Sequence, residues 1–402
     1  MRGRAWALGL AGAFVLAIVG AGFWFAGPTQ QRQQARGPKT AADVDTTELA
    51  ARLAAGDADA LSAFRDKVIA IGEQGQAAKI TQDELTDQIE LLHGSARGLT
   101  KYGPTGRAMI AGLAGTILER LAVEPAPPNW TRCLTPIHEV LGQTLADPES
   151  TVRVAALSVT ARTWNWLPGR GPLPVEETFL GEWKDSFTKA VTGLLVDPDA
   201  QVRAAAVLNL AQVPIDEMAA PAAVRVADVA VEVRRQTLIG FAKRPEVLPE
   251  ESILPRLHDE DQSVVMLARV ILEQRGLSAA QIELGEQVFS PLVSVRKNVV
   301  HHLEGRDDID PIVWLIHLSR DPDQSVRSEV LDALSKAQLA LPNVRERLTE
   351  MALNDPSGKV RVRARALLPT EAAALLPDAD ATDATVAIPP LPGSSALRPR
   401  AN

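Results

Sequence analysis

The side chains best suited to metal binding or acid–base chemistry are few in this chain and mostly scattered. Of its six histidines, only His301, His302 and His317 lie near one another in the sequence, with Glu304 between them. Imidazole and carboxylate groups bind transition metals when they converge on one point. Adjacent residues on a helix point about 100° apart, which disfavours a shared ion for His301 and His302. The spacing favours surface or hydrogen-bonded histidines over a metal site.

Motifs of nucleophilic and phosphate chemistry are also lacking. The sequence contains no glycine-rich phosphate loop, no G-x-S-x-G, no H-E-x-x-H and no EF-hand pattern. Its single cysteine, Cys133, cannot form an internal disulfide or a cysteine-based metal cage. We therefore expect no catalytic residue, no bound cofactor and no metal.

The charge balance argues against nucleic acid as a partner. Five basic residues precede the first acid, Asp43, and the rest of the chain carries 37 basic and 50 acidic residues, a net charge of −13. Such a surface repels phosphate backbones, so we expect no nucleic-acid binding. Aromatic residues make up only 4% of the chain, a composition that suits stacked helices better than a β-sandwich.

A seven-residue motif, D-P-x-x-x-V-R, recurs along the second half of the chain. Its valine recurs at spacings of 50, 31, 31, 31, 31 and 34 residues, as Val152, Val202, Val233, Val264, Val295, Val326 and Val360. Aspartate stands five residues before this anchor valine in six of the seven copies, with Ser290 as the exception. Arginine follows the valine in six of seven, with Val265 as the exception.

The motif has the composition of a helix start. Aspartate is a preferred N-cap, and proline suits the first helical position. The anchor valine and the residues four and eight positions later are mostly apolar and fall on one face, which predicts an amphipathic helix. Another apolar-periodic segment precedes each aspartate, so the predicted unit is helix, turn, helix.

These repeats resemble the HEAT-like family, in particular its short form of about 31 residues, also seen in phycobilisome lyases. The resemblance extends from Cys133 to Pro369 and implies an all-α fold: an α-solenoid, a right-handed superhelix of stacked helix pairs that usually binds another protein. It also implies a structural ladder of aspartates and arginines between neighbouring repeats. The residues that would form it are Asp147, Arg153, Asp197, Arg203, Asp228, Arg234, Asp259, Arg296, Asp321, Arg327, Asp355 and Arg361.

The composition divides the chain into five segments. They are a signal anchor or transmembrane helix (1–28), a flexible polar stalk (29–42), divergent helical capping repeats (43–128), seven HEAT-like repeats with an insertion near 164–183 (129–369), and a disordered Pro/Ala-rich tail (370–402). The fold class expected is therefore an α-solenoid preceded by a single transmembrane helix.

Residues 5–26 carry no charge and would reach about 33 Å as a helix, enough to cross a bilayer core. Trp6 stands near one end and Trp24 near the other, as at membrane interfaces. The alternative is a cleaved signal peptide. The short tail before the anchor favours a single-pass protein whose bulk is extracytoplasmic, in the periplasm. Small residues stand at every fourth position, Gly9, Ala13, Ala17 and Ala21; they either permit weak self-association through this helix or simply reflect an Ala- and Gly-rich sequence.

Two groups of residues are candidates for contact with a partner. The insertion carries Trp164, Trp166 and Trp183, which either bind a partner or pack beneath the loop as a small satellite core.

The second group lies two and six residues after the anchor valines, opposite the apolar stripe. It forms either an apolar strip on the inner wall, suited to an amphipathic helix or extended segment, or core buried between tightly wound repeats. Its members are Leu208, Arg235, Ile239, Met266, Val270, Lys297 and His301.

The sequence therefore predicts a membrane-anchored, non-catalytic scaffold for another protein. Two alternatives remain: a repeat-based enzyme or a subunit that handles a chromophore or metal, and a soluble periplasmic binder whose signal peptide is cleaved.

Overall fold

The computed structural model describes residues 45–73, 81–121, 131–164, 177–213, 215–303, 306, 309–337 and 341–369. Within these ranges every regular element is an α-helix or a short 3-10 helix, and there is no strand. The prediction of an all-α fold is confirmed. The predicted anchor (1–28), stalk (29–42) and tail (370–402) lie outside the described residues. In the part described, no helix combines the length and hydrophobicity that a membrane crossing requires.

Two helix pairs precede the repeats that carry the motif. The first pair is α2 (Thr46–Ala55) and α3 (Ala58–Glu73), and the second is α4 (Gln82–Gly98) and α5 (Pro104–Leu121), with the 3-10 turn η2 (Leu99–Lys101) between them. The predicted capping box of α4 is present, because Thr81 Oγ1 accepts the Glu84 N–H at 3.2 Å and the Glu84 carboxylate accepts the Thr81 N–H.

Each of the seven motif copies joins two helical segments, a first and a second helix. In chain order these are α6 (Thr131–Leu145) with α7 (Ser150–Trp164); α8 (Glu177–Gly193) and η3 (Leu194–Val196) with α9 (Ala200–Ala211); α10 (Asp216–Ala223) and η4 (Val224–Ala227) with α11 (Val231–Phe241); α12 (Glu250–Ile253) and η5 (Leu254–His258) with α13 (Gln262–Gln274); α14 (Ala279–Val288) with α15 (Val293–His302); α16 (Pro311–Leu318) with α17 (Gln324–Ala337); and α18 (Pro342–Asn354) with α19 (Gly358–Leu367).

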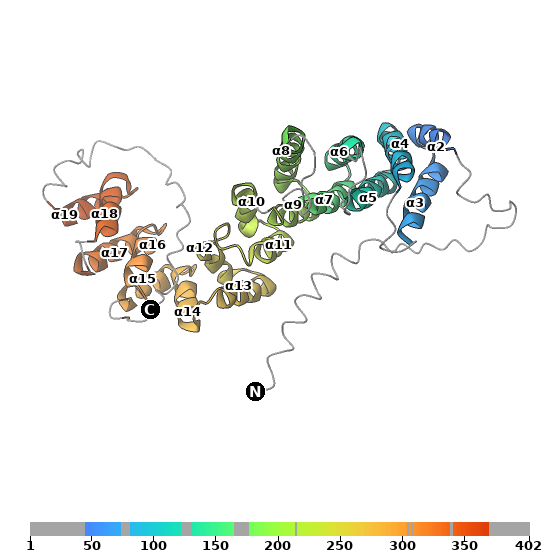
Figure 1. Ribbon diagram of the computed structural model, residues 1–402. Helices are drawn as coiled ribbons and strands as arrows, with labels where there is room; N and C mark the ends of the chain where they lie inside the picture. Colours follow the sequence, from blue (N-terminus) through green and yellow to red (C-terminus); the bar gives the residue numbers. More distant parts are fainter. Residues whose placement is uncertain are drawn as a thin grey trace. The chain divides into compact units, whose positions relative to one another are not determined.

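The second helices of neighbouring pairs pack against each other from α3 to α13 and from α15 to α19, as α5, α7 and α9 do in Figure 1. Because each pair contacts mainly its neighbours, the arrangement is that of an α-solenoid. The anchor valines lie in the core between helices. Six of the seven are completely buried, while Val295 is only half-buried.

The α2–α4 contact shows how close these helices come. A Cβ atom added to Gly94 would lie 2.4 Å from the Ala50 carbonyl oxygen, and one added to Gly98 would lie 2.2 Å from that of Leu53. Only glycine fits at either position of α4, so the two backbones can approach directly.

One detail of the motif differs from the sequence prediction. The motif aspartate is not the N-cap of the second helix, because α9 and α13 are capped by Asp199 and Asp261, two residues later. The motif aspartate instead ends the preceding segment, as Asp197 does for η3, and its Oδ1 accepts the N–H two residues on, at 2.9 Å from Asp199 N. The Asx-turn uses only part of the accepting capacity of the carboxylate, which also accepts from Arg153 Nη2 at 2.8 Å.

Candidate protein-interaction surface

The motif aspartates and arginines form one series of ion pairs between neighbouring repeats, here called the ladder. In each pair the arginine of one repeat donates to the aspartate of the next, with N–O distances of 2.6–3.0 Å. The pairs are Arg107–Asp147, Arg153–Asp197, Arg203–Asp228, Arg234–Asp259, Arg296–Asp321 and Arg327–Asp355.

Each motif arginine also secures the turn of its own repeat. Arg327 Nη1, for example, donates to the Asp321 carbonyl oxygen at 2.8 Å, and Arg361 Nη1 donates to that of Asp355 at 2.8 Å. The aspartate side chains of the ladder are no more than 6% exposed. A buried carboxylate is stable only when charge and hydrogen bonds compensate it, so the six pairs have a structural role.

The electrostatics of the ladder agree with this role. The hydrogen bonds that Arg107, Arg203, Arg234 and Arg296 donate to their aspartates raise the pKa values of these arginines. Burial alone would raise the pKa of Asp228, but the hydrogen bonds from Arg203 and the Ala230 N–H, together with the positive charges of Arg203 and Arg225, lower it. The raised pKa of Arg203 and the lowered pKa of Asp228 both favour the ionised form of this pair.

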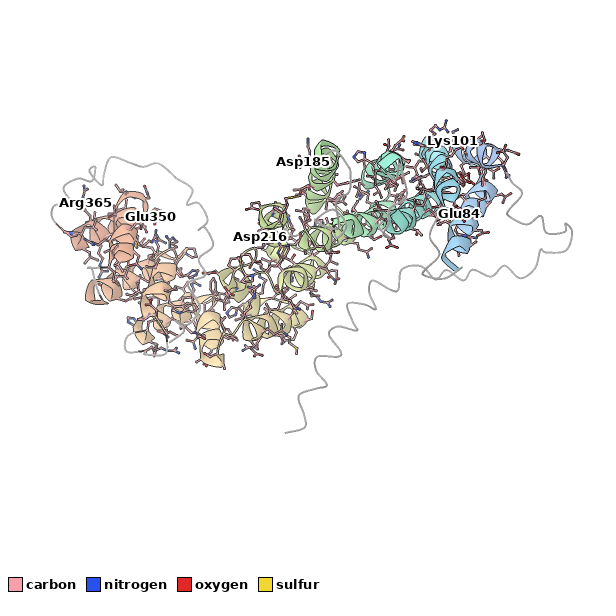
Figure 2. All side chains as sticks on the ribbon, viewed as in Figure 1. Glu84, Lys101, Asp185, Asp216, Glu350 and Arg365 are labelled. Atoms are coloured by element: carbon pink, nitrogen blue, oxygen red, sulfur yellow. The ribbon has the colours of Figure 1, made fainter. Side chains whose placement is uncertain are left out.

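Arg107 is a member of the ladder that the motif does not reveal. It stands in the second capping pair, where Lys101 occupies the aspartate position and Gly106 the valine position. Its guanidinium nevertheless makes two hydrogen bonds to Asp147, at 2.6 and 2.9 Å, and donates to the Tyr102 carbonyl oxygen. Lys101, labelled in Figure 2, donates instead to the Ala54 carbonyl oxygen at 2.6 Å.

A second series of arginines closes the carboxyl ends of the second helices. Arg244 Nη1 donates to the Ala211 and Val213 carbonyl oxygens beyond α9, at 3.2 and 2.7 Å, and its Nη2 pairs with Asp216, labelled in Figure 2. Arg275 donates in the same way to the Phe241, Ala242 and Leu248 carbonyl oxygens. Carbonyl groups at and just beyond a helix end lack the next turn of helix as a donor, and here an arginine of the next repeat donates to them.

The sequence contained a signal for this second series. Arg244, Arg275 and Arg306 stand 31 residues apart, the period of the repeat. They lie beside the proline and glycine residues that mark helix ends, outside the motif, so an alignment restricted to the motif does not include them.

The second-helix row comprises the residues two and six positions after the anchor valines on α9, α11, α13, α15 and α17. Of its apolar members, Leu208 and Ile239 are half-buried, whereas Met266 is 61% exposed and Val270 is 43% exposed. The row is therefore partly core packed between repeats and partly an exposed apolar surface. Leu208 and Ile239 lie where second helices pack together, and Met266 and Val270 form an exposed apolar pair on one face of α13.

Charged members of the row flank this apolar pair. Arg235 on α11 pairs with Glu232 of the same helix at 3.1 Å. On the other side, Lys297 and His301 of α15 lie 3.2 and 3.6 Å from the Glu329 carboxylate of α17. The row thus contains apolar residues on α9 and α13 and charged residues on α11 and α15, a mixture that suits an amphipathic segment of a partner.

The tryptophans of the insertion are placed only in part. Trp164 ends α7 and Trp183 lies within α8, but their side chains and all of Trp166 lie outside the described residues. Their predicted contact with a partner stays a prediction.

The histidines that prompted the question of a metal site have separate surroundings. His302 Nδ1 lies 2.6 Å from the Asn298 carbonyl oxygen of its own helix, and the His317 ring packs on Phe289 with centroids 4.6 Å apart. Glu304 lies outside the described residues. Among the residues that are described, no three side chains of metal-ligand type come together.

A hollow of about 110 Å³ lies beside the last ladder pair, where α18 meets the turn between α16 and α17. Arg347 donates to Ser319 Oγ at 2.6 Å and pairs with Glu350 at 2.7 Å, and Glu350, labelled in Figure 2, also pairs with Arg320 at 3.3 Å. Because these charges neutralise one another, the hollow shows no group directed at a ligand.

Comparison with known proteins supports the repeat assignment. Residues 283–368 match the family model described as HEAT repeats. This region includes most of α14 and all of α15 to α19. No curated protein matches the sequence.

Solved structures give distant similarities. They include an engineered protein, with 16% identity over 82% of this chain and 94% of that one, at a TM-score of 0.29. They also include Kap121p bound to RanGTP, with 14% identity, 80% and 40% coverage and a TM-score of 0.36, and a mutant of Kap121p, with 14% identity, 80% and 41% coverage and a TM-score of 0.35. The matched region spans about 40% of the Kap121p chain. These similarities are too distant to bear on function.

The burial of His317 predicts a pH-dependent contribution to stability. Burial, followed by the positive charge of Arg320, lowers the His317 pKa from 6.5 to about 4. Between these values the unfolded chain binds a proton that the folded chain does not. Neutral His317 therefore makes its full contribution to the free energy of unfolding above pH 6.5. This free energy falls by roughly 3 kcal/mol in total as the pH decreases towards 4.

Urea unfolding at pH 7.5 and pH 5 measures this dependence. We expect His317→Phe to lose less stability between the two values than the unaltered protein, while His302→Gln, at an exposed histidine, behaves as the unaltered protein does. If His317→Phe and the unaltered protein lose the same free energy of unfolding between pH 7.5 and pH 5, His317 is not the source of the pH dependence.

Proposed function

We propose that this protein is a non-catalytic, membrane-anchored scaffold that binds another protein through the second-helix row, centred on Met266 and Val270. The observation that carries the proposal is the exposure of these two side chains. They lie four residues apart on one face of α13, at 61% and 43% exposure, where a solvent-facing helix is ordinarily polar.

The chemistry of the row indicates the kind of partner. Methionine is flexible and polarisable, so it adapts to different apolar surfaces. The Arg235–Glu232 ion pair lies on α11, which packs against α13, and adds polar groups to this surface. An amphipathic helix or extended segment with a narrow apolar stripe fits this arrangement.

The non-catalytic role is supported by the engagement of the charged groups. The arginines and aspartates of the ladder serve contacts between repeats, and His317 lies against Phe289. None of these groups is directed at a substrate-sized cavity among the described residues.

The substitution Met266→Ser/Val270→Ser tests the interaction surface. Both side chains are largely exposed, so the change should alter the free energy of unfolding by only about 0.5 kcal/mol. We expect chemical crosslinking in native membranes, followed by purification, to lose a specific crosslinked protein while thermal melting is unchanged.

A matched control is Val224→Ser/Val229→Ser, which also removes two exposed apolar side chains, 68% and 89% exposed, but on η4 and in the turn after it, outside the row. This variant should retain the crosslinked protein. Equal crosslinking in all three proteins, or equal loss in both variants, would refute the proposed surface.

Membrane attachment rests on the uncharged apolar segment at residues 5–26. We infer that this segment remains attached and holds the repeats in the periplasm. The protein should then resist carbonate extraction, and protease added to intact spheroplasts should digest the repeats. A soluble product that begins near Gly22 would show cleavage instead, and complete protection from protease would reverse the orientation.

A further inference from the structure

The ladder has one interruption among the described repeats, and both partners are replaced there. Val265 stands where the fourth repeat would have arginine, and Ser290 stands where the fifth would have aspartate. In the six intact pairs the arginine of one repeat bonds the aspartate of the next, so these two exceptions belong to the same junction. Replacing one partner alone would bury an uncompensated charge, whereas replacing both leaves none.

Ser290 keeps the local function of the aspartate and loses only the contact between repeats. Its Oγ accepts the Leu292 N–H at 3.2 Å, as Asp321 Oδ1 accepts the Asp323 N–H at 2.7 Å. Its carbonyl oxygen accepts from Arg296 Nη1 at 2.7 Å. The turn between α14 and α15 is therefore built like the others, and the change affects only the tie to the preceding repeat.

The packing is weaker at this same junction. The second helices of adjoining pairs pack extensively from α3 to α13 and again from α15 to α19, but α13 and α15, both described in full, do not. Val295 is half-buried while the other six anchor valines are completely buried. Leu292, at the start of α15, is 61% exposed.

The first-helix side of the junction remains closed. Gly285 of α14 lies so near η5 that an added Cβ would be 2.4 Å from Leu254 Cδ2. His258 Nε2 lies 2.6 Å from the Glu286 carbonyl oxygen, and Arg269 of α13 pairs with the Glu286 carboxylate at 2.9 Å. The junction is thus held along α14 and unsecured between α13 and α15.

We propose that this junction is a hinge, at which residues 45–277 and 278–369 change their relative orientation by opening and closing the space between α13 and α15. The pivot is the contact of α14 with η5, and the missing ion pair permits the motion. Solenoid repeats interact mainly with their neighbours, so one weakened interface can bend without disturbing the others. The hinge does not depend on the proposed interaction and is testable in the isolated protein.

Distances between spin labels on either side of the junction test the hinge. The purified full-length chain carries Cys133→Ser and one of two label pairs, Ser263→Cys/Ser294→Cys across the hinge or Ser294→Cys/Ser325→Cys across the next junction. All three serines are exposed and directly precede an anchor valine, so the pairs are matched in position. We expect a broader distance distribution across the hinge than across the next junction, where Arg296 binds Asp321.

Restoring the ion pair should remove the difference. In Val265→Arg/Ser290→Asp the distribution across the hinge should narrow to that of the control pair, whereas neither single substitution should narrow it. The reverse change, Arg296→Val/Asp321→Ser, should broaden the control pair.

If the two label pairs give distance distributions of equal width in the otherwise unaltered chain, the hinge proposal is wrong. An unchanged width across the hinge in Val265→Arg/Ser290→Asp with native helix content by circular dichroism would also overturn it. If Val265→Arg/Ser290→Asp loses helix content, the test is Arg296→Val/Asp321→Ser. An unchanged distance distribution for the control label pair in that variant overturns the proposal.

Discussion

A buried ion pair between an arginine and the aspartate of the next repeat is the interaction on which the array depends. The arginine bonds its own turn through Nη1 and the neighbouring carboxylate through Nε or Nη2, so one side chain fixes both the geometry of a repeat and its register with the next. A second series, represented by Arg244 and Arg275, closes the carboxyl ends of the preceding helices. Apolar burial supplies most of the stability of such a fold, whereas these directional contacts specify which helix faces which.

The exposed surface and the weak junction have the same origin. Where the second helices pack closely, as α9 packs on α11, the row residues Ala204 and Leu208 are buried or half-buried. Where Val265 and Ser290 replace the ion pair, α13 and α15 do not pack extensively, and Met266 and Val270 on α13 remain exposed. A loss of structural contact in one place thus provides apolar surface available to a partner, beside the segment that is free to move.

The 31-residue valine period predicted the helix pairs, because a regular spacing of buried residues reflects a regular spacing of helices. It also identified both exceptions in the motif. The period could not show that Val265 and Ser290 occupy the two ladder positions of one junction, because the ladder joins an arginine to the aspartate of the following repeat, a register set by tertiary packing. Arg107 escaped prediction because its turn lacks the aspartate and valine, and Arg244 because it lies outside the motif. The predicted N-caps were wrong by two residues because the motif aspartates form an Asx-turn before the helix begins.

The central claim, that the ladder pairs couple neighbouring repeats, is most directly tested by a double-mutant cycle at Arg327 and Asp355, whose carboxylate side chain is 2% exposed. We predict that Arg327→Val lowers the free energy of unfolding by about 3–5 kcal/mol, because it leaves a buried carboxylate without its partner. The cycle consists of Arg327→Val, Asp355→Ser and Arg327→Val/Asp355→Ser; the double variant, which reproduces the residues of the natural interruption, should cost less than Arg327→Val alone. Additive effects of the two sites, measured by urea denaturation, would show no coupling and would contradict the account.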